Sequence, residues 1–594
     1  MIRIADYIIN QLYENGVKHI FMVTGRGALF LTDAAAAHKE FKCVSVHHEQ
    51  AAAYAAVAYA DYMGKFGACL VSTGCAGTNA LTGVLNAWQD GIPCVFISGQ
   101  NKLDETSHFT GIPLRTFGQQ EADIIPIVES ITKYAVMITN PNEIVYEMEK
   151  ALYLAQTGRK GPVWIDVPLD IQNKRIEPDE LEHYTPNTEQ DFEPSDEDME
   201  YVINALCNAK RPAILIGSGG RLASAVKEFE QFIEKTSIPV TFTNTAPDTY
   251  GSDNLLSIGS VGMMGCSRTG NFTVQSSDLL LVLGSRLSTM TTGEEGNKFA
   301  REAKVIVVDI DRVEHSKEGI AIDRLIIADV KIFLNVLMGN NIKKVSNEWR
   351  NKCLHWKKVF PKCENQYKVD KEVDLYHLAE SFSEALPNNS IFLSDSGLVE
   401  LILPTNINFK SDQRCIHPAS QGSMGFALPG LVGAYYASGH PIVAVIGDGS
   451  IMMNLQELET IRYNNIPAKI FIINNNVYAV IRKRQVDLFR NRTIGVDPSD
   501  GISCPNFKKV SSAFEIPYTI IKNNNKLVEK LKSVINTEGP VICEIMAKEN
   551  QDYISNSYAK NSKKRFVRRP IEDQAPFLDR ELFLSEMIID PIDQ

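Results

Sequence analysis

Long hydrophobic runs are absent from this sequence, although hydrophobic residues make up 44% of its 594 positions. The longest apolar stretches, such as residues 441–446, have the length of a β-strand, whereas a membrane-spanning helix needs about 20 apolar residues. The first six residues form an amphipathic helix start without the apolar core of a secretory signal. We therefore expect a cytoplasmic protein that does not bind or cross a membrane.

Paired cysteines and excess positive charge are lacking too. The eleven cysteines are odd in number and no two have the CxxC spacing of a zinc or redox site, which favours free thiols in a reducing compartment. The formal net charge of −12 argues against a general binder of nucleic acid or anionic membranes. A small anionic ligand is not excluded, because a few local arginines are sufficient to bind one.

Strand-length apolar runs that alternate with helical patterns make up most of the chain. The length suggests about three or four domains. In residues 1–175, short apolar runs such as 19–23 and 69–72 alternate with helical segments such as 49–63, which indicates parallel strands covered on both faces. The same pattern recurs in residues 201–340 and 374–550. We predict an α/β fold with three doubly wound parallel-sheet domains.

Three segments lack this pattern. Residues 176–200 are acidic and contain proline, which is typical of a linker, and residues 341–373 resemble a helical connector. The tail, residues 551–594, contains the basic run Lys563-Lys564-Arg565. We expect this C-terminal arm to be solvated and packed onto the body, and the alternative is a lid whose arginines reach an anionic substrate.

A Gly-Asp-Gly-Ser motif at residues 447–450 gives the clearest functional signal. It directly follows a predicted strand, and Asn475 follows the next one, 27 residues after Asp448. That spacing fits one strand–helix–strand crossover, so both side chains should lie at the carboxyl ends of neighbouring strands. A carboxylate and an amide oxygen suit a Mg²⁺ ion that also holds phosphate.

The surroundings of this motif suit an anion as well. Glycines let backbone N–H groups approach a phosphate, and a helix predicted at residues 453–462 would add its positive N-terminal end. Alone, the motif could be a tight turn and the asparagines a strand cap. Their combination at this spacing favours a cofactor site.

A GDG followed about two dozen residues later by NN resembles the diphosphate motif of thiamine diphosphate enzymes. Residues 1–550 as a whole resemble the acetohydroxyacid synthase and pyruvate oxidase branch of those enzymes. The resemblance implies a pyrimidine-binding, a central and a diphosphate-binding domain, in that order, with Mg²⁺ held by Asp448, Asn475 and the backbone carbonyl of Val477. The other matching cofactor-binding positions are Gly25, Thr73, Asn79, Ser396, Gly397, Gly422, Met424, Gly447, Gly449, Ser450 and Tyr478.

The string His47-His48-Glu49-Gln50 resembles the motif that carries the activating glutamate of this family. From the residues alone, a helix N-cap is an equal alternative. The resemblance implies that Glu49 is catalytic, bonds N1′ of the aminopyrimidine and so promotes removal of the C2 proton. The Ala-rich helix that follows should bury Glu49 and raise its pKa. Gln120 is the matching candidate on the substrate side. The resemblance further implies active sites shared between subunits, hence a homodimer or homotetramer.

The sequence departs from acetohydroxyacid synthases where the acceptor would bind. A tryptophan is replaced by Arg484, an aromatic residue by Gln119, and a glycine of the first loop by Arg26. Together with Arg482, these residues would form a cationic pocket that suits a carboxylate, a phosphate or a nucleotide diphosphate. The alternative is that the arginines point into solvent.

The central domain contains a glycine turn that follows a strand. Such a turn is weak evidence by itself, but several positions match the FAD-binding positions of acetohydroxyacid synthases: Gly217, Gly219, Gly220, Arg286 and Asp309. A bound FAD would be structural, because the expected reaction needs no net redox step.

These observations predict a carboligase. It would decarboxylate pyruvate or another 2-oxo acid and transfer the acyl unit to an acceptor carbonyl, with a nucleotide keto-sugar as the candidate acceptor. The alternatives are acetolactate synthase proper and a 2-oxo acid decarboxylase or oxidase. A non-catalytic, regulatory cofactor binder is disfavoured by the presence of Glu49.

Overall fold

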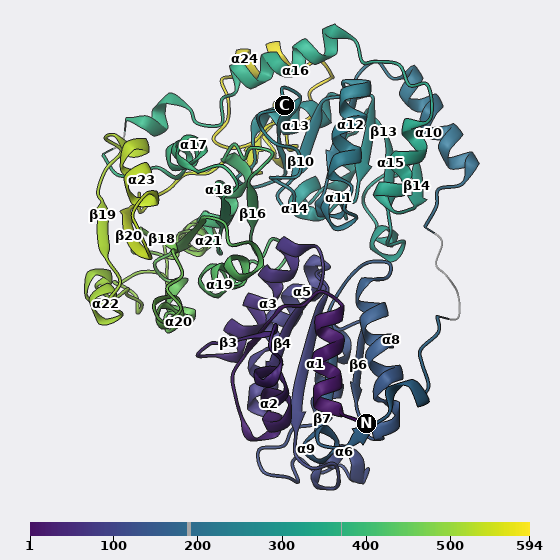
Figure 1. Cartoon of the computed structure of the whole chain (residues 1–594). Helices are drawn as coiled ribbons and strands as arrows, with labels where there is room; N and C mark the ends of the chain where they lie inside the picture. The colour runs from purple at the N-terminus through teal and green to yellow at the C-terminus, as the bar shows by residue number, and fades with distance from the viewer. Residues whose placement is uncertain (187–191, 370, 594) are drawn as a thin grey trace.

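Three six-stranded parallel sheets form the body of the molecule, as predicted (Figure 1). The computed structural model describes residues 1–186, 192–369 and 371–593. In Figure 1 the first domain lies below, the central domain at the upper right and the third domain at the upper left. Helices cover both faces of each sheet because the strands are apolar on both sides.

The first sheet has the strand order β3-β2-β4-β5-β7-β6. Its strands are β2 (His19–Met22), β3 (Lys42–Ser45), β4 (Gly67–Val71), β5 (Cys94–Gln100), β6 (Tyr134–Met137) and β7 (Val163–Pro168). The main helices around it are α1 (Ile4–Glu14), α2 (Leu29–Ala37), α3 (Glu49–Met63), α5 (Leu81–Asp90) and α8 (Ile144–Gln156). A short antiparallel pair, β1 (Ile2–Arg3) with β8 (Arg175–Ile176), joins the two ends of this domain.

The central sheet has the order β11-β10-β9-β12-β13-β14. Its strands are β9 (Pro212–Ile216), β10 (Val240–Thr243), β11 (Ser257–Val261), β12 (Leu279–Leu283), β13 (Lys304–Asp309) and β14 (Arg324–Ile327). The main helices are α10 (Asp196–Asn208), α11 (Ser218–Leu222), α12 (Val226–Thr236), α13 (Arg268–Gln275) and α15 (Val330–Met338).

The third sheet has the order β16-β15-β17-β18-β20-β19. Its strands are β15 (Ile391–Leu393), β16 (Arg414–Ile416), β17 (Ile442–Gly447), β18 (Lys469–Asn474), β19 (Tyr518–Ile521) and β20 (Val541–Met546). The main helices are α17 (Leu375–Ala385), α18 (Leu398–Asn406), α19 (Ala427–Ser438), α20 (Glu457–Tyr463), α21 (Ala479–Phe489), α22 (Phe507–Ala513) and α23 (Leu527–Ile535).

Two predictions about where helices begin need correction. Helix α10 begins at Asp196, inside the predicted linker, because the Ser195 hydroxyl caps it by accepting from the Asp198 N–H at 3.1 Å. The helix predicted at residues 453–462 is a 3₁₀ turn at Ile451–Met453 followed by α20, so α20 does not begin beside Asp448. The connector contains α16 (Asn347–Val359). Residues 187–191 of the linker lie outside the described part.

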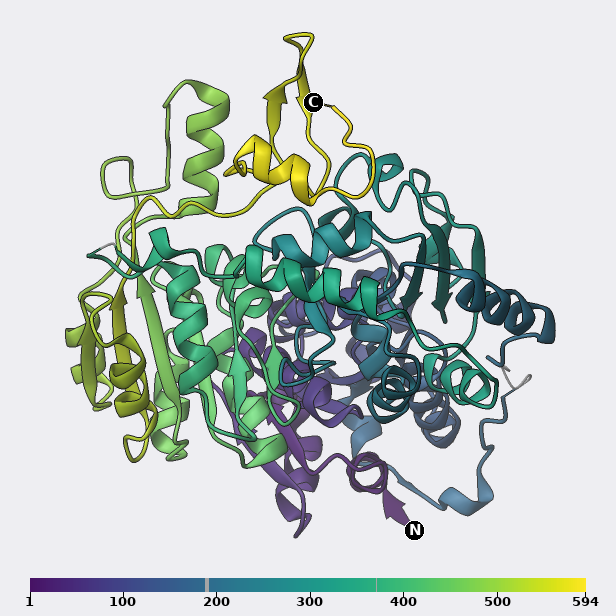
Figure 2. The ribbon, with the colours of Figure 1, turned by 90° about the horizontal axis from the view of Figure 1, so that it is seen from above.

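The C-terminal arm packs onto the central domain and the connector. It forms the hairpin β21 (Tyr558–Lys560) and β22 (Phe566–Arg568), followed by α24 (Arg580–Glu586) (Figure 2). Arg301 pairs with the buried Glu572 at 2.7 Å, and Glu586 pairs with Lys352 at 2.7 Å. The basic run 563–565 is exposed in the hairpin turn, so the arm is both anchored and partly solvated.

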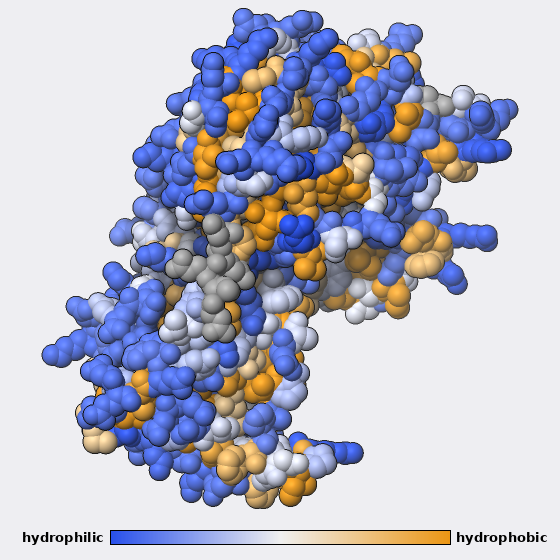
Figure 3. All heavy atoms as spheres, turned by 90° about the vertical axis from the view of Figure 1, so that its right-hand side faces the viewer, coloured by the Kyte–Doolittle hydropathy of each residue, from blue (hydrophilic) through white to orange (hydrophobic). Residues whose placement is uncertain are grey.

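Hydrophilic side chains dominate the face shown in Figure 3, and hydrophobic ones gather where the upper and lower parts of the molecule meet. Among the described residues, no helix is both long and apolar enough to span a bilayer.

The first and third domains share one hydrophobic core, which runs between α3 and α19. The two helices are so close that a Cβ added to Gly433 would lie 1.9 Å from the carbonyl oxygen of Ala55. A glycine is therefore required there. This contact fixes the start of α3, and with it Glu49, relative to the third sheet.

Candidate active site

Asp448 and Asn475 lie at the carboxyl ends of β17 and β18, which are neighbouring parallel strands. The Asp448 side chain is buried, and burial raises the pKa of its carboxyl group. One carboxylate oxygen accepts from the Gly449 N–H at 2.8 Å and the other from the Asn476 N–H at 2.7 Å. Each oxygen keeps a further lone pair. A fixed carboxylate beside an amide is a donor set that fits Mg²⁺.

Gly449 faces the ring of Tyr478, the residue that follows Val477. A Cβ on Gly449 would lie 2.0 Å from a ring carbon of Tyr478, so only glycine fits between the ring and the strand end. The Tyr478 N–H is in turn held by the Val496 carbonyl at 2.8 Å. Two of the predicted cofactor-binding positions therefore touch each other.

Asp395 is a central residue of this site that the sequence analysis did not single out. One of its oxygens accepts from the Ser396 and Gly425 N–H groups, each at 2.9 Å, and from the Ser450 hydroxyl. The other accepts from the Ala427 N–H at 2.7 Å. Asp395 thus ties three loops together. Its position two residues after β15, next to the predicted Ser396, was the signal available in the sequence.

Segment 417–425, between β16 and α19, approaches the same loops. The Ser396 hydroxyl donates to the Gly422 carbonyl at 2.7 Å. Gly397 and Gly422 have φ values of +77° and +61°, which glycine adopts without strain. A Cβ on Gly397 would meet no atom within 4 Å, so open space lies beside it. Met424, the expected wedge under the cofactor, is half-buried in this segment.

Glu49 is the first residue of α3, and the prediction that it is buried is wrong for this chain. The alanines that follow are buried in the shared core, but Glu49 stands at the end of the helix and is half-exposed. Its carboxylate accepts from the side-chain amide of Asn79 at 2.9 Å. The helix cap itself is supplied by His48, which accepts from the Gln50 N–H at 3.1 Å.

The predicted loops of the first domain meet at the edge of its sheet. A Cβ on Gly25 would lie 2.4 Å from the Ser72 side chain, and one on Gly74 would lie 1.8 Å from the Gln120 carbonyl oxygen. The Arg26 guanidinium donates to the Gln119 side chain at 2.7 Å. Arg26, Gln119 and Gln120 are exposed, and the neighbouring Thr73 is buried, where it donates to Gln100.

One hydrogen-bonded path links the two parts of the site within the chain. Gln50, next to Glu49, accepts from the Asn454 amide at 3.0 Å, and the same amide donates to the Gly425 carbonyl at 3.0 Å. Asn454 is buried and follows the Gly-Asp-Gly-Ser motif by four residues. The start of α3 therefore contacts the diphosphate-side loops.

The two arginines of α21 have different surroundings. Arg482 pairs with Glu549 and donates to the Asn550 side chain at 2.7 Å, so its charge is already balanced. Arg484 is exposed, and its nearest described partner is the sulfur of Met264 in the central domain, at 4.0 Å. Arg484 can therefore interact with an anionic ligand, whereas Arg482 is held by acidic groups.

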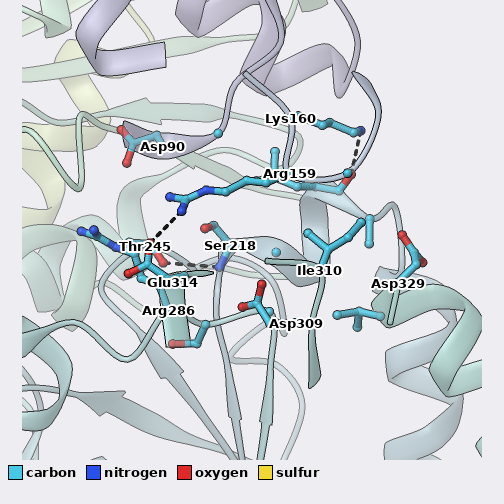
Figure 4. Close-up of a pocket in the computed structure, with 18 of the residues that line it drawn as sticks. Asp90, Arg159, Lys160, Ser218, Thr245, Arg286, Asp309, Ile310, Glu314 and Asp329 are labelled. Atoms are coloured by element: carbon cyan, nitrogen blue, oxygen red, sulfur yellow. Dashed lines mark hydrogen bonds and ion pairs between the residues drawn. The ribbon is translucent and has the colours of Figure 1, made fainter. Parts of the chain in front are cut away.

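A cavity of about 390 Å³ lies at the carboxyl ends of the central strands (Figure 4). Three of the five predicted FAD-binding residues line it: Gly219, Arg286 and Asp309. Gly217 and Gly220 do not line it. Gly217 is required by packing, because a Cβ there would lie 2.3 Å from the Gly284 carbonyl oxygen. The Gly219 N–H is bonded to that same carbonyl at 2.9 Å, so phosphate would contact side chains here rather than this N–H.

Comparisons with known proteins agree with this geometry. Models of thiamine pyrophosphate enzymes match the N-terminal TPP binding domain at residues 2–127, the central domain at 199–337 and the C-terminal TPP binding domain at 395–545. The chain is 30% identical over 562 residues to acetolactate synthase 1, chloroplastic, of Zea mays, covering 91% of this chain and 85% of that protein. It is 30% identical over 566 residues to the acetolactate synthase large subunit of Cyanidium caldarium, covering 92% and 94%.

The matched segments contain Glu49, Asp395, Asp448 and Asn475, the residues around which the structure builds the site. The chain therefore belongs to the thiamine pyrophosphate enzymes, as an acetolactate synthase-like member that uses thiamine diphosphate and Mg²⁺.

Proposed function

We propose that this enzyme decarboxylates pyruvate or a related 2-oxo acid and transfers the acyl unit to the carbonyl of an anionic acceptor, with a nucleotide keto-sugar as the best candidate. The observation that carries the proposal is the exposed Arg484 on α21, the helix that follows Asn475 in the chain, in a family whose named relatives are acetolactate synthases. Arg26 and Arg484 are positions at which the proposed acceptor side of this chain departs from acetohydroxyacid synthases.

Each part of the site has a role in this reaction. When bound, thiamine diphosphate supplies the ring that accepts the electrons released by decarboxylation. Asp448, Asn475 and the Val477 carbonyl would hold Mg²⁺ and the diphosphate. Glu49, oriented by the Asn79 amide at 2.9 Å, would hold a proton at the pyrimidine nitrogen. Met424 would support the bent form of the cofactor.

We assign two exposed cations from different domains to the acceptor side. Arg26 is oriented by Gln119, and Arg484 projects from α21. A planar guanidinium binds phosphate or carboxylate through two parallel hydrogen bonds. 2-Oxobutyrate also carries a carboxylate, but next to its reacting carbonyl, and its other end is an apolar ethyl group that would gain nothing from a cation. The charge therefore favours an acceptor that carries a phosphate or a carboxylate remote from its carbonyl.

Product analysis by mass spectrometry tests this proposal. The enzyme, Mg²⁺, thiamine diphosphate and pyruvate are incubated with 2-oxobutyrate or with a nucleotide keto-sugar. We expect coupling to the nucleotide sugar, and Arg484→Trp should reduce that product and favour 2-oxobutyrate. The matched control is Arg490→Trp, at an exposed position just after α21. A wild-type preference for 2-oxobutyrate would contradict the acceptor assignment.

Acetolactate synthesis is the second candidate, because the relatives carry that name over more than nine-tenths of this chain. In that case pyruvate alone would give acetolactate. Acetaldehyde without a coupled product would indicate a decarboxylase, and hydrogen peroxide would indicate an oxidase.

We also propose that two copies associate through the open side of the site. Exposed apolar side chains flank both parts: Phe109, Ile112, Leu114 and Phe117 near Gln120, and Ile481, Leu488, Phe489 and Ile494 on and after α21. Such clusters are typical of interfaces. The sites would then combine Glu49 of one copy with Asp448 of the other.

Complementation tests this arrangement. Glu49→Gln and Asp448→Asn chains are co-expressed with different tags and the mixed dimer is isolated. If each site uses both copies, one of its two sites is intact, and about half of the wild-type activity should return. If each site lies within one chain, the mixed dimer has no intact site and stays inactive. Light scattering gives the oligomeric state independently.

We further propose that the central cavity binds the nucleoside diphosphate part of FAD. Arg286 and the hydroxyl groups of Ser218 and Thr245 can donate to phosphate oxygens, and Asp309 can accept from ribose hydroxyls. An absorbance spectrum of the purified protein, before and after addition of FAD, tests whether the flavin binds.

A further inference from the structure

The central cavity lies where all three domains meet. Figure 4 shows Asp90, Arg159 and Lys160 of the first domain on one side and Ser218, Arg286 and Asp309 of the central domain on the other. Arg159 crosses between the domains and pairs with Glu314 at 2.7 Å. Ser420, from segment 417–425 of the third domain, completes the wall. A ligand in this cavity would therefore touch every domain.

Segment 417–425 connects the cavity directly to the diphosphate side of the thiamine site. At the cavity, the Ser420 N–H donates to the Asp90 carboxylate at 3.1 Å. Two residues later, the Gly422 carbonyl accepts from Ser396 at 2.7 Å. At its end, the Gly425 N–H donates to Asp395 at 2.9 Å. The same short segment carries Met424.

Helix α5 makes a second connection, to the Glu49 side. Asn79, just before the helix, donates to Glu49 at 2.9 Å. The Thr82 carbonyl in its first turn accepts from the Gln421 amide at 3.0 Å. Asp90 is its last residue. Ten residues of helix span about 15 Å, so α5 joins the cavity to Glu49 as one rigid element.

We propose that a nucleoside diphosphate moiety in the central cavity tightens the binding of thiamine diphosphate, and that Asp90 is the positioning residue that couples the two sites. This proposal rests on the thiamine site and the nucleotide cavity described above. A ligand seated against Asp90 and Ser420 restricts segment 417–425 and the end of α5 together. Thiamine diphosphate then binds to loops that are already ordered and loses less conformational entropy.

The surroundings of Asp90 suit this role. One carboxylate oxygen holds the Ser420 N–H, and the other accepts from the Asn86 amide at 2.7 Å. The side-chain amide oxygen of Asn86, Oδ1, is buried and has no hydrogen-bond partner among the described residues. In an Asp90→Asn variant, Asn86 could turn that oxygen toward the new amide, so the contact with Ser420 would survive. Asp90→Ala removes both contacts.

Calorimetry on the full chain, freed of bound nucleotide, tests the coupling. Thiamine diphosphate is titrated with Mg²⁺ present, without nucleotide, with saturating ADP and with saturating FAD. We expect at least about fivefold tighter binding with ADP or FAD. Because coupling is reciprocal, thiamine diphosphate should tighten ADP binding by the same factor. If FAD tightens thiamine diphosphate binding and ADP does not, the coupling is supported and the nucleoside diphosphate moiety is that of the flavin.

Variants of Asp90 distinguish a positioning role of this residue from a role in folding alone. Asp90→Ala should still bind ADP but lose the gain, and it should need more thiamine diphosphate for half-maximal activity while its kcat at saturation stays near wild type. Asp90→Asn should retain the gain, as should the control Asp104→Ala, at an exposed position of the same domain.

Three results would overturn the proposal. The first is a thiamine diphosphate affinity of wild type that changes neither with ADP bound nor with FAD bound. The second is an undiminished gain in Asp90→Ala. The third is a cavity that binds neither ADP nor FAD. A chain that fails to bind thiamine diphosphate under every condition would instead contradict the thiamine site, so the two failures are distinguishable.

Discussion

Two buried aspartates in the third domain are stabilised by backbone N–H groups rather than by cations. Asp395 accepts from three N–H groups and Asp448 from two. Hydrogen bonds of this kind offset part of the cost of burying a carboxylate. Asp395 thereby fixes loops, and Asp448 keeps lone pairs for a metal. Residue type alone does not separate these roles, because both aspartates follow a buried strand.

Gly449 gives a test of the close approach at the diphosphate side. Gly449→Ala places a methyl group against the Tyr478 ring, 2.0 Å from its nearest carbon. Overpacking of this kind costs about 1–3 kcal/mol. The free loop relieves it by moving, and thiamine diphosphate must restore the original loop geometry, so we expect up to roughly 5- to 150-fold weaker binding by calorimetry. Gly339→Ala is the control, at an exposed position after α15 where the added Cβ would meet only the Val336 carbonyl oxygen, at 3.3 Å. Equal affinities for both variants would contradict the interpretation.

Asp166, within β7, gives a test of pH dependence. It is fully buried, it accepts from the Ser98 hydroxyl at 2.5 Å, and burial raises its pKa to about 7. The nearby Asp123 and Glu121 raise the pKa further. Because the folded-state pKa lies above the unfolded one, near 3.8, this group stabilises the fold at low pH and the contribution is lost as pH rises toward 7.

The stability of an Asp166→Asn variant should therefore vary less with pH. We expect its Tm, relative to wild type, to rise between pH 4 and 8. Over that range the free energy of unfolding of the variant, relative to wild type, should increase by at most about 4 kcal/mol. Thermal unfolding at several pH values measures this, and Asp104→Asn at an exposed site serves as the control. Parallel Tm curves for Asp166→Asn and wild type would show that Asp166 ionises normally.

At the scale of elements, α21 differs from the other long helices because none of its residues is buried. Figure 2 shows it projecting from the body beside the hairpin of the C-terminal arm. Its periodicity predicts a helix but not a face that packs. Within the chain, Arg482 attaches it to the residues after β20, through Glu549 and Asn550.

Removing this attachment should loosen α21. Arg482→Ala loses charge-assisted hydrogen bonds worth about 1.5–3 kcal/mol, so we expect roughly 10- to 150-fold faster proteolytic cleavage within residues 479–496. Limited proteolysis followed by mass spectrometry locates and times the cut. Lys483→Ala, which breaks only the exposed pair with Asp487, should cleave at the wild-type rate. If both variants behave alike, Arg482 does not anchor the helix.

At the scale of the whole molecule, one charge cluster around the buried Asp248 joins the three domains. Arg414 of the third domain pairs with Asp248 of the central domain at 2.8 Å and with Asp61 of the first at 3.4 Å. Arg221 of the central domain adds a second cation, 3.4 Å from Asp248. The pKa of Asp248 is lowered by these cations in spite of its burial. The cluster lines a smaller pocket, and Asp90 belongs to the walls of both this pocket and the central cavity.

Breaking the cluster should loosen the arrangement of the domains. Arg414→Met leaves Asp61 and Asp248 without their shared cation, and removing one partner of a buried ion pair costs about 3–5 kcal/mol. We expect a lower Tm and separate unfolding transitions in a calorimetric scan. Arg462→Met, which breaks the exposed pair with Glu459, should leave the scan unchanged. A single, unshifted transition in Arg414→Met would mean that the domains are held by apolar contacts alone.

The sequence by itself determined the fold class and the cofactor. Unalternated apolar strands require a sheet covered on both faces, and a fixed spacing between Asp448 and Asn475 follows from one crossover. Both depend on neighbours along the chain, so local pattern suffices. The tertiary structure decided the rest: the exposure of Glu49, the pairing of Arg482 with Glu549, and the role of Asp395. Each of these depends on which distant segment packs against the residue. The packing of the three domains around one shared core and one charge cluster determines those contacts.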